Sequence, residues 1–258
     1  MTKLSVNVNK IALLRNQREV GVPSVLGLSV VALQAGAHGI TVHPRPDARH
    51  IRPGDVEELS ALLASTEWAD REFNIEGNPL DFGGGHLMPI LRRVKPTQAT
   101  LVPDDPAQNT SDHGWDVVKH LERLKPIVAE LKDLGCRVSL FLDPDPEMAK
   151  RAADTGADRI ELYTESYAVA FEQGGDALKR SLEAFTATAE AAASVGLGVN
   201  AGHDLNLDNL PGFCAIPNVL EVSIGHALIA DALAMGMADT VKVYLQACGV
   251  ATGANSLS

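Results

Sequence analysis

Short apolar runs alternate with longer amphipathic segments along the whole 258-residue chain, and this alternation limits the fold more than any other feature. Runs rich in β-branched residues predict eight strands, at 4–8, 39–43, 72–76, 98–103, 137–143, 159–164, 197–200 and 220–224. Helical patterns cover 24–37, 54–65, 85–94, 114–134, 146–155, 175–195, 207–213 and 227–247. Strands that alternate with helices pair in parallel. Because these strands are mainly apolar, we expect them to be buried on both faces.

Four of the helix-to-strand junctions share one pattern, seen in QAGAHGITV, DLGCRVSL, DTGADRIEL and SVGLGVNA. In each, a glycine follows the last helical turn, where a left-handed residue commonly ends a helix. The next apolar run then enters the sheet. The repeated junction and the eight strands favour a (β/α)₈ TIM barrel of the α/β class.

A Rossmann sheet is disfavoured because no G-x-G-x-x-G follows the first strand. No linker or low-complexity tract marks a second domain, so residues 1–248 are expected to form a single barrel domain. The 21-residue segments 114–134 and 175–195 exceed the average helix of about 12 residues, which suggests extra helices. Residues 249–258 lack apolar periodicity and are expected to form a flexible tail.

The overall charge of the chain excludes one class of partner. A net charge of −11 argues against nucleic-acid binding, which normally needs a basic field. Three widely spaced cysteines match no zinc or redox motif and indicate a reduced protein. No apolar run approaches the ~20 residues of a membrane helix, and no signal peptide is recognisable. We therefore expect a cytoplasmic protein without a membrane partner.

The active site of a (β/α)₈ barrel lies at the carboxyl ends of its strands, so the polar residues there are the candidates. His43, Glu76 and His203 follow three different strands and are proton-transfer groups. Glu161 lies in the sixth predicted strand. Any one strand-end histidine or carboxylate has roughly an even chance of being purely structural. That explanation weakens for several such groups that converge from different strands.

A second group of candidates is suited to anions. Gly225 and His226 begin the last predicted helix, after the eighth strand, where backbone N–H groups favour a phosphate. Arg18, Arg45 and His50 are candidates for a second anion. Two anion sites around proton-transfer groups suggest two phosphorylated substrates or one bisphosphate.

Other interpretations of individual residues remain open. Asp143 is expected to cap a helix, Arg15 and Arg49 to lie on solvated faces, and Asn7 to satisfy barrel backbone. Three histidines with Glu76 could hold a metal, but no H-x-H or H-x-x-x-H pair occurs and Arg45 is nearby, so no metal is predicted. No lysine ends a strand, which disfavours a Schiff-base aldolase.

Motifs from the first strand to the last helix resemble the pyridoxine 5'-phosphate synthase family of vitamin B6 biosynthesis. The matching stretches are VNVNKIALLRNQR, AGAHGITVHPRPDARHI, FNIEGNP, ATLVPD, CRVSLFLD, GADRIELYTESYA, GLGVNAGHDLN and LEVSIGHALI. The H-x-R-x-D-x-R-H pattern together with N-A-G-H makes the resemblance specific.

The resemblance implies a barrel with additional helices that assembles into octamers built from dimers. It implies condensation of 1-deoxy-D-xylulose 5-phosphate with 3-amino-2-oxopropyl phosphate to pyridoxine 5'-phosphate, phosphate and water, without a cofactor. It makes His43 and Glu76 proton acceptors, His203 a proton donor and Glu161 a weaker transition-state support. The implied substrate contacts are Asn7, Lys10, Arg18, Arg45, His50, Thr110, Gly225 and His226.

The sequence departs from the family pattern at three places. Asn9-Lys10 replaces the usual Asp-His, Asp204 replaces a usual glycine, and the segment GNPLDFGGGH after Glu76 is longer than usual. These departures indicate a divergent subgroup. The alternatives are another phosphate-handling barrel isomerase or epimerase, and a non-catalytic barrel that binds a phosphorylated ligand.

Overall fold

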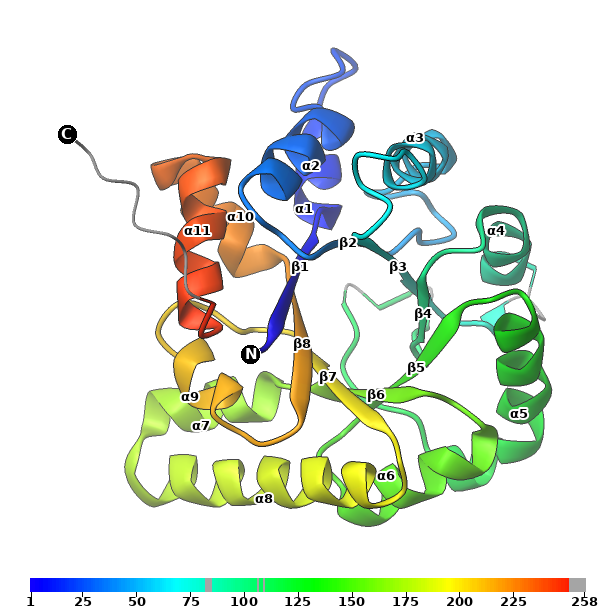
Figure 1. Ribbon diagram of the computed structural model, residues 1–258, viewed down its shortest axis with the longest axis vertical. Coiled ribbons are helices and arrows are strands. Elements are labelled where there is room, and N and C mark those ends of the chain that lie inside the picture. The colour runs from blue at the N-terminus through cyan, green and yellow to red at the C-terminus, as the bar shows by residue number, and fades with distance from the viewer. Residues whose placement is uncertain (82–84, 106, 109, 251–258) are drawn as a thin grey trace.

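The computed structural model describes residues 1–81, 85–105, 107–108 and 110–250. Eight parallel strands form one closed barrel in chain order, and β1 pairs with β8 to close it. Figure 1 shows the strands as an inner ring with the helices outside. The strands are β1 (Lys3–Asn7), β2 (Gly39–Val42), β3 (Glu72–Gly77), β4 (Gln98–Leu101), β5 (Arg137–Leu142), β6 (Arg159–Tyr163), β7 (Gly198–Gly202) and β8 (Val219–Ile224). The predicted barrel is confirmed, and no strand boundary is wrong by more than two residues.

The helices surround this barrel and include more than one per strand. They are α1 (Asn9–Arg15), α2 (Val25–Gln34), α3 (Pro53–Leu63), α4 (Leu87–Val94), α5 (Val117–Asp133), α6 (Pro146–Ala152), the 3₁₀ turn η2 (Ala153–Thr155), α7 (Glu165–Gln173), α8 (Gly175–Ser194), α9 (Leu210–Cys214), α10 (His226–Met235) and α11 (Met237–Ala247). No helix in the described part of the chain is long and apolar enough to cross a membrane.

The extra helices differ from those expected. The long segments form the uninterrupted helices α5 and α8, whereas α1 and α7 are additional short helices that the pattern did not reveal. The predicted helix 227–247 is two helices, α10 and α11, because Gly236 adopts a φ of 81° between them. The junction glycines behave as predicted, since Gly36, Gly135, Gly156 and Gly196 all have positive φ.

The barrel interior is polar, which corrects the expectation of strands that are apolar on both faces. Leu4 and Val6 are fully buried between Lys3, Ser5 and Asn7, so apolar and polar residues alternate along β1. Inside the barrel, the Ser5 and Thr41 hydroxyls lie 2.7 Å apart. Asn74 continues this network, because its amide accepts a hydrogen bond of 3.0 Å from Thr100.

A charged layer fills the amino end of the interior. Arg137 pairs with Glu72, and its guanidinium lies 3.8 Å from Glu221. Arg159 lies 3.5 Å from Glu221. Gln98 donates to both carboxylates, at 3.2 Å to Glu72 and 3.4 Å to Glu221. These side chains from β3, β4, β5, β6 and β8 fill this end with paired groups, and the opposite end holds the open cavity described next.

Candidate active site

A cavity of about 880 Å³ opens at the carboxyl ends of the strands, where the sequence predicted the site. Its lining includes every predicted site residue except Arg18: Asn7, Lys10, His43, Arg45, His50, Glu76, Thr110, Glu161, His203, Gly225 and His226. Val102 and Phe141 add an apolar wall. The fold thus brings the proton-transfer groups and the anion-site candidates into one space.

His43 follows β2 directly and is held on three sides. Its backbone N–H donates to the Asn9 side chain at 2.9 Å. Its Nε2 lies 2.9 Å from Asp104 Oδ2, and its Nδ1 lies 3.8 Å from Glu76 Oε2. Asn9 therefore supplies an oxygen that fixes the strand end, as an aspartate there could. Asn9, which stands where the family usually has an aspartate, therefore keeps the hydrogen bond to the His43 backbone although it carries no charge.

Glu76 projects into the buried interior near the end of β3. Its nearest hydrogen-bond donor is the Asn74 amide at 3.4 Å, which is a weak contact. Burial raises the pKa of Glu76 well above its ordinary value, and the charges of Glu161 and Asp104 raise it further. A carboxylate whose pKa is raised in this way is a stronger base than an ordinary carboxylate.

Glu161 enters the same interior from β6. Burial raises its pKa to about 7, although a hydrogen bond of 3.3 Å from the Thr100 hydroxyl opposes the shift. A Cβ at Gly202, on the neighbouring strand, would lie 2.8 Å from Glu161 Oε1. Glycine at 202, which the N-A-G-H motif supplies, therefore leaves room for the carboxyl in this position.

His203 follows β7 on another part of the cavity wall and has a φ of 91°. Its Nδ1 lies 2.9 Å from Asp204 Oδ2, and its Nε2 lies 2.8 Å from the Thr110 hydroxyl. The hydrogen bond to His203 is the largest cause that lowers the pKa of Asp204, so the carboxylate is charged and accepts the Nδ1 hydrogen. Asp204, which stands where the family usually has a glycine, thus contacts His203, the predicted proton donor.

The amino terminus of α10 forms the end of the cavity expected to bind phosphate. Gly225 is the N-cap, His226 is the first helical residue, and no side chain caps the helix. A Cβ at Gly225 would meet the Asn7 side chain at 3.2 Å, so the close approach of β1 favours glycine. Ser223 also lines the cavity, and its buried hydroxyl has no partner among the described residues. Donors are therefore available here for an anion.

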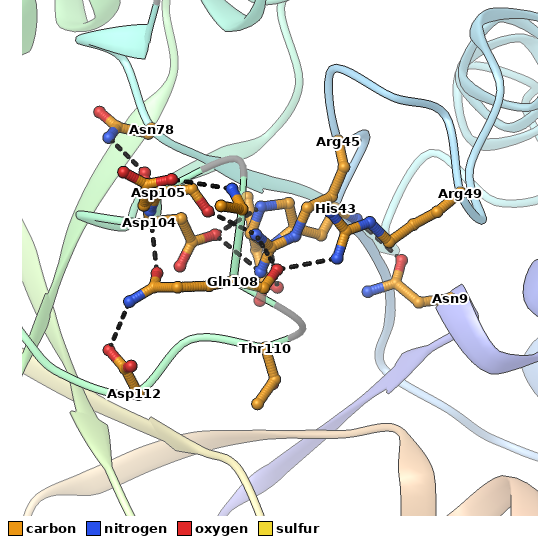
Figure 2. A network of polar contacts seen from close by, with 12 residues as sticks. Asn9, His43, Arg45, Arg49, Asn78, Asp104, Asp105, Gln108, Thr110 and Asp112 are labelled. Atoms are coloured by element: carbon orange, nitrogen blue, oxygen red, sulfur yellow. Dashed lines mark hydrogen bonds and ion pairs between the residues drawn. The ribbon is translucent and has the colours of Figure 1, made fainter.

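Figure 2 shows how the loop after β2 is tied to the loop after β4. The Arg45 guanidinium lies 3.1 Å from Asp104 Oδ2 and also approaches the carbonyl oxygens of Asp105 and Gln108. Arg49 donates to the Gln108 carbonyl at 2.8 Å. Much of the positive charge of these arginines is therefore already balanced within the protein.

His50 and Lys10 complete this basic side of the cavity. Burial lowers the pKa of His50 to about 3, and the charges of His43 and Arg45 lower it further. The His50 ring is therefore neutral at pH 7, and its Nδ1 accepts the Ile51 N–H. Lys10 lines the cavity with no hydrogen bond or ion pair to another described residue. Its ammonium group is therefore available to an anionic ligand.

Three sequence interpretations need correction or lack support. Arg18 is exposed in the turn after α1 and does not line the cavity. Arg15 is not on a solvated face, because it pairs with buried Asp55. Asp143 accepts from the Gly114 N–H, while Asp145 caps α6.

Sequence inspection missed Asp104 entirely. It follows β4 at the start of a polar loop whose other carboxylates are exposed, so composition gave no reason to choose it. Within the described ranges, no group of three or more His, Cys, Asp and Glu side chains is arranged to hold a metal ion.

Comparison with known proteins identifies the family. The model of the family described as "Pyridoxal phosphate biosynthesis protein PdxJ" matches residues 4–249. The chain belongs to this family. A relative from Albidiferax ferrireducens named pyridoxine 5'-phosphate synthase is 53% identical over 251 residues, covering 95% of this chain and 96% of that protein. A relative of the same name from Mesorhizobium japonicum is also 53% identical, over 96% of this chain and 98% of that protein.

Solved structures of low sequence identity share the barrel. KGPDC from Streptococcus mutans superposes with a TM-score of 0.64 at 13% identity, over 96% of this chain and 98% of that chain. Phosphoribosyl anthranilate isomerase from Thermotoga maritima gives 0.58 at 12% identity, over 96% of this chain and 99% of that chain. At these identities the likeness extends only to the fold.

Proposed function

We propose that this PdxJ-family protein is a pyridoxine 5'-phosphate synthase. It condenses 3-amino-2-oxopropyl phosphate with 1-deoxy-D-xylulose 5-phosphate to pyridoxine 5'-phosphate, phosphate and water. The observation that carries the proposal is one cavity holding His43, Glu76 and His203 together with donors for anions on two sides. Its family and its 53% identical relatives support the same reaction.

The division of roles follows from where the groups lie. His43 and Glu76 face each other at 3.8 Å and act as the proton acceptors. His203 comes from another strand, has its Nδ1 engaged by Asp204, and acts as the proton donor. Imine formation, dehydration and ring closure each move protons at more than one atom, so a single acid–base group would not suffice. Glu161, with a pKa of about 7, supports charge that develops in the transition state.

Two anion positions serve the two phosphates. One lies at the start of α10, with Gly225, His226 and the Ser223 hydroxyl. The other lies near Lys10 and neutral His50, close to the loop that carries Arg45. Asn7 and Thr110 add polar contacts between protein and substrate, while Phe141 and Val102 give the forming ring an apolar surface.

The cellular setting is proposed on simpler grounds. A single barrel domain spans residues 1–248, since its elements run from Lys3 to Ala247. The protein acts in the cytoplasm and assembles as a homo-oligomer, an octamer built from dimers, in keeping with its family. It uses two phosphorylated small molecules, binds no nucleic acid or membrane, and needs no metal or organic cofactor. The net charge of −11 supports the exclusion of nucleic acid.

The direct test is to mix the purified protein with both substrates in the presence of a chelator and to measure pyridoxine 5'-phosphate and inorganic phosphate. The proposal predicts both products in equal amounts, and neither when one substrate is omitted. Absence of both products with both substrates present would overturn it. Solvent deuterium incorporation into, or isomerisation of, 1-deoxy-D-xylulose 5-phosphate alone, without ring formation, would instead support the isomerase or epimerase alternative.

A further inference from the structure

Asp104 is a buried carboxylate beside the proposed acid–base groups, and it lies outside the cavity lining. Its side chain is 4% exposed. Oδ2 lies 2.9 Å from His43 Nε2 and 3.1 Å from the Arg45 guanidinium. Asp104 therefore acts on a substrate only through the cavity-lining side chains that it contacts, His43 and Arg45.

The backbone around Asp104 is anchored by side chains from the loops after β2 and β3. Its carbonyl accepts a hydrogen bond of 2.7 Å from the Asn78 amide, just after β3. The Arg45 side chain reaches the carbonyl oxygens of the next loop residues, Asp105 and Gln108, as Figure 2 shows. Two independent loops thus hold the carboxylate in place against His43.

The charge state of Asp104 decides which nitrogen of His43 carries a hydrogen. Burial opposes ionisation of Asp104, but the contact with His43 and the charge of Arg45, whose guanidinium lies 3.1 Å away, lower its pKa below the ordinary range. An ionised carboxylate only accepts hydrogen bonds, so a hydrogen bond across this 2.9 Å contact has His43 Nε2 as its donor. In the neutral ring the lone pair then lies on Nδ1, which faces Glu76 Oε2 at 3.8 Å.

We propose that Asp104 is a positioning residue that holds the hydrogen of neutral His43 on Nε2 and leaves Nδ1 as the proton-accepting atom. This inference rests on the proposed function, in which His43 accepts a proton. On accepting it, the His43 ring becomes a cation flanked by the Asp104 carboxylate, which stabilises that charge without itself taking a proton. The strand-end contact from Asn9 holds the backbone, so the two contacts fix both the place and the tautomer of the ring.

A solution measurement on the unliganded protein tests the tautomer independently of activity. Long-range ¹H–¹⁵N correlation spectra of histidine-labelled protein distinguish Nε2–H from Nδ1–H rings, and His43→Gln assigns the signal. We expect wild-type His43 to be the Nε2–H tautomer, and Asp104→Asn to shift the population toward Nδ1–H. A wild-type His43 in the Nδ1–H form, or a spectrum unaltered by Asp104→Asn, would overturn the proposal.

Kinetics then separate positioning from loop support. Asp104→Asn should lower kcat by about 10²- to 10³-fold with KM within threefold, because the substitution keeps shape but removes the charge that orients the base. Asp104→Glu should have a kcat at least tenfold higher than that of Asp104→Asn. Asp105→Asn is the matched control, since that side chain is exposed and, among the described residues, accepts a hydrogen bond only from the Ala107 backbone N–H; it should leave kcat unchanged.

These results remain informative if a variant folds poorly. The wild-type spectrum needs no variant other than the one used for assignment, and Asp104→Glu retains the ion pair with Arg45. A raised KM with normal kcat in Asp104→Asn would reduce the residue to loop support and contradict its role on His43. Failure of the wild type to form product would refute the proposed function alone, because the tautomer is read without substrate.

Discussion

The two ends of strand β3 carry the same side chain in different surroundings. Glu72 and Glu76 both project into the barrel and are each 8% exposed. At the amino end, Glu72 is paired with Arg137 and accepts a hydrogen bond from Gln98. At the carboxyl end, Glu76 has a weak bond from Asn74 and a histidine at 3.8 Å. Compensated charge stabilises the fold at one end, and uncompensated acid–base groups remain for chemistry at the other.

This contrast extends to the neighbouring strands. The amino-end layer supplies two arginines, Arg137 and Arg159, for two carboxylates. Burial and the charge of Glu72 still raise the pKa of Glu221, so its pairing is incomplete. At the carboxyl end, the one hydrogen-bond donor to Glu161 within the described ranges is the Thr100 hydroxyl, at 3.3 Å. The protein thus concentrates ionisable groups at both ends, but Glu76 and Glu161 at the carboxyl end form no ion pair with an arginine or lysine in the described part of the chain.

The largest expected effect comes from Glu76→Gln, which removes a proton acceptor and keeps the shape. Turnover should fall by at least about 10³-fold while substrate affinity stays within about tenfold. Thermal stability should not fall, because burial disfavours the charged form of the wild-type carboxyl and the glutamine is neutral. Single-turnover product formation and equilibrium substrate binding measure the two quantities. An unchanged rate would remove Glu76 from the mechanism.

Arg137→Met should have the largest effect on stability. It leaves Glu72 without its ion pair, and we expect a loss of about 2–4 kcal/mol in the free energy of unfolding. Turnover per folded molecule should stay within threefold. Urea unfolding followed by circular dichroism gives the stability. Arg151→Met is the matched control, because its pair with Asp154 is exposed, and it should change stability by less than about 0.5 kcal/mol.

Glu161→Gln should alter how stability depends on pH. A carboxyl with a raised folded-state pKa contributes stability below its unfolded pKa, and that contribution is lost as pH rises to about 7. As the pH rises from about 4.5 to 7, the free energy of unfolding should therefore fall more steeply for the wild type than for Glu161→Gln. Above pH 7 the two free energies should change with pH in parallel. Denaturant titrations across pH measure this. Glu190→Gln, on the exposed surface of α8, should keep the wild-type slope.

The smallest effect is expected at the binding side. His50→Ala should raise the KM for one phosphorylated substrate by about five- to tenfold with kcat within twofold, through loss of a neutral hydrogen-bonding ring. Since the pKa of His50 is about 3, the ratio of the KM of His50→Ala to the KM of the wild type should be the same at every pH between 6 and 8. Arrested chemistry with normal binding would show that His50 belongs with the acid–base groups.

The sequence was sufficient to predict the barrel and the side of it that carries the site. The β-branched runs and junction glycines are local signals, and the polar residues after each strand then converge by topology. His43, Glu76, Glu161 and His203 were found in this way. The two helices α10 and α11 were merged because apolar periodicity continues across Gly236.

What the sequence could not predict depends on three-dimensional pairing. Asp104 resembles the exposed carboxylates beside it until the loop folds against His43. The interior ion pairs of Arg137 and Arg159 join residues on separate strands, near the strand starts, where a solvated position was equally plausible. The neutral state of His50 depends on burial and nearby cations, so a local count of positive residues overestimated the charge of its loop.

The most direct test compares Glu72→Gln with Glu76→Gln in one assay of product formation per folded molecule. Both substitutions change the same side chain on the same strand, four positions apart. We predict that Glu72→Gln keeps kcat within threefold of wild type and that Glu76→Gln loses at least about 10³-fold. Equal losses in the two variants, or a greater loss in Glu72→Gln, would contradict the assignment of chemistry to the carboxyl end of the barrel.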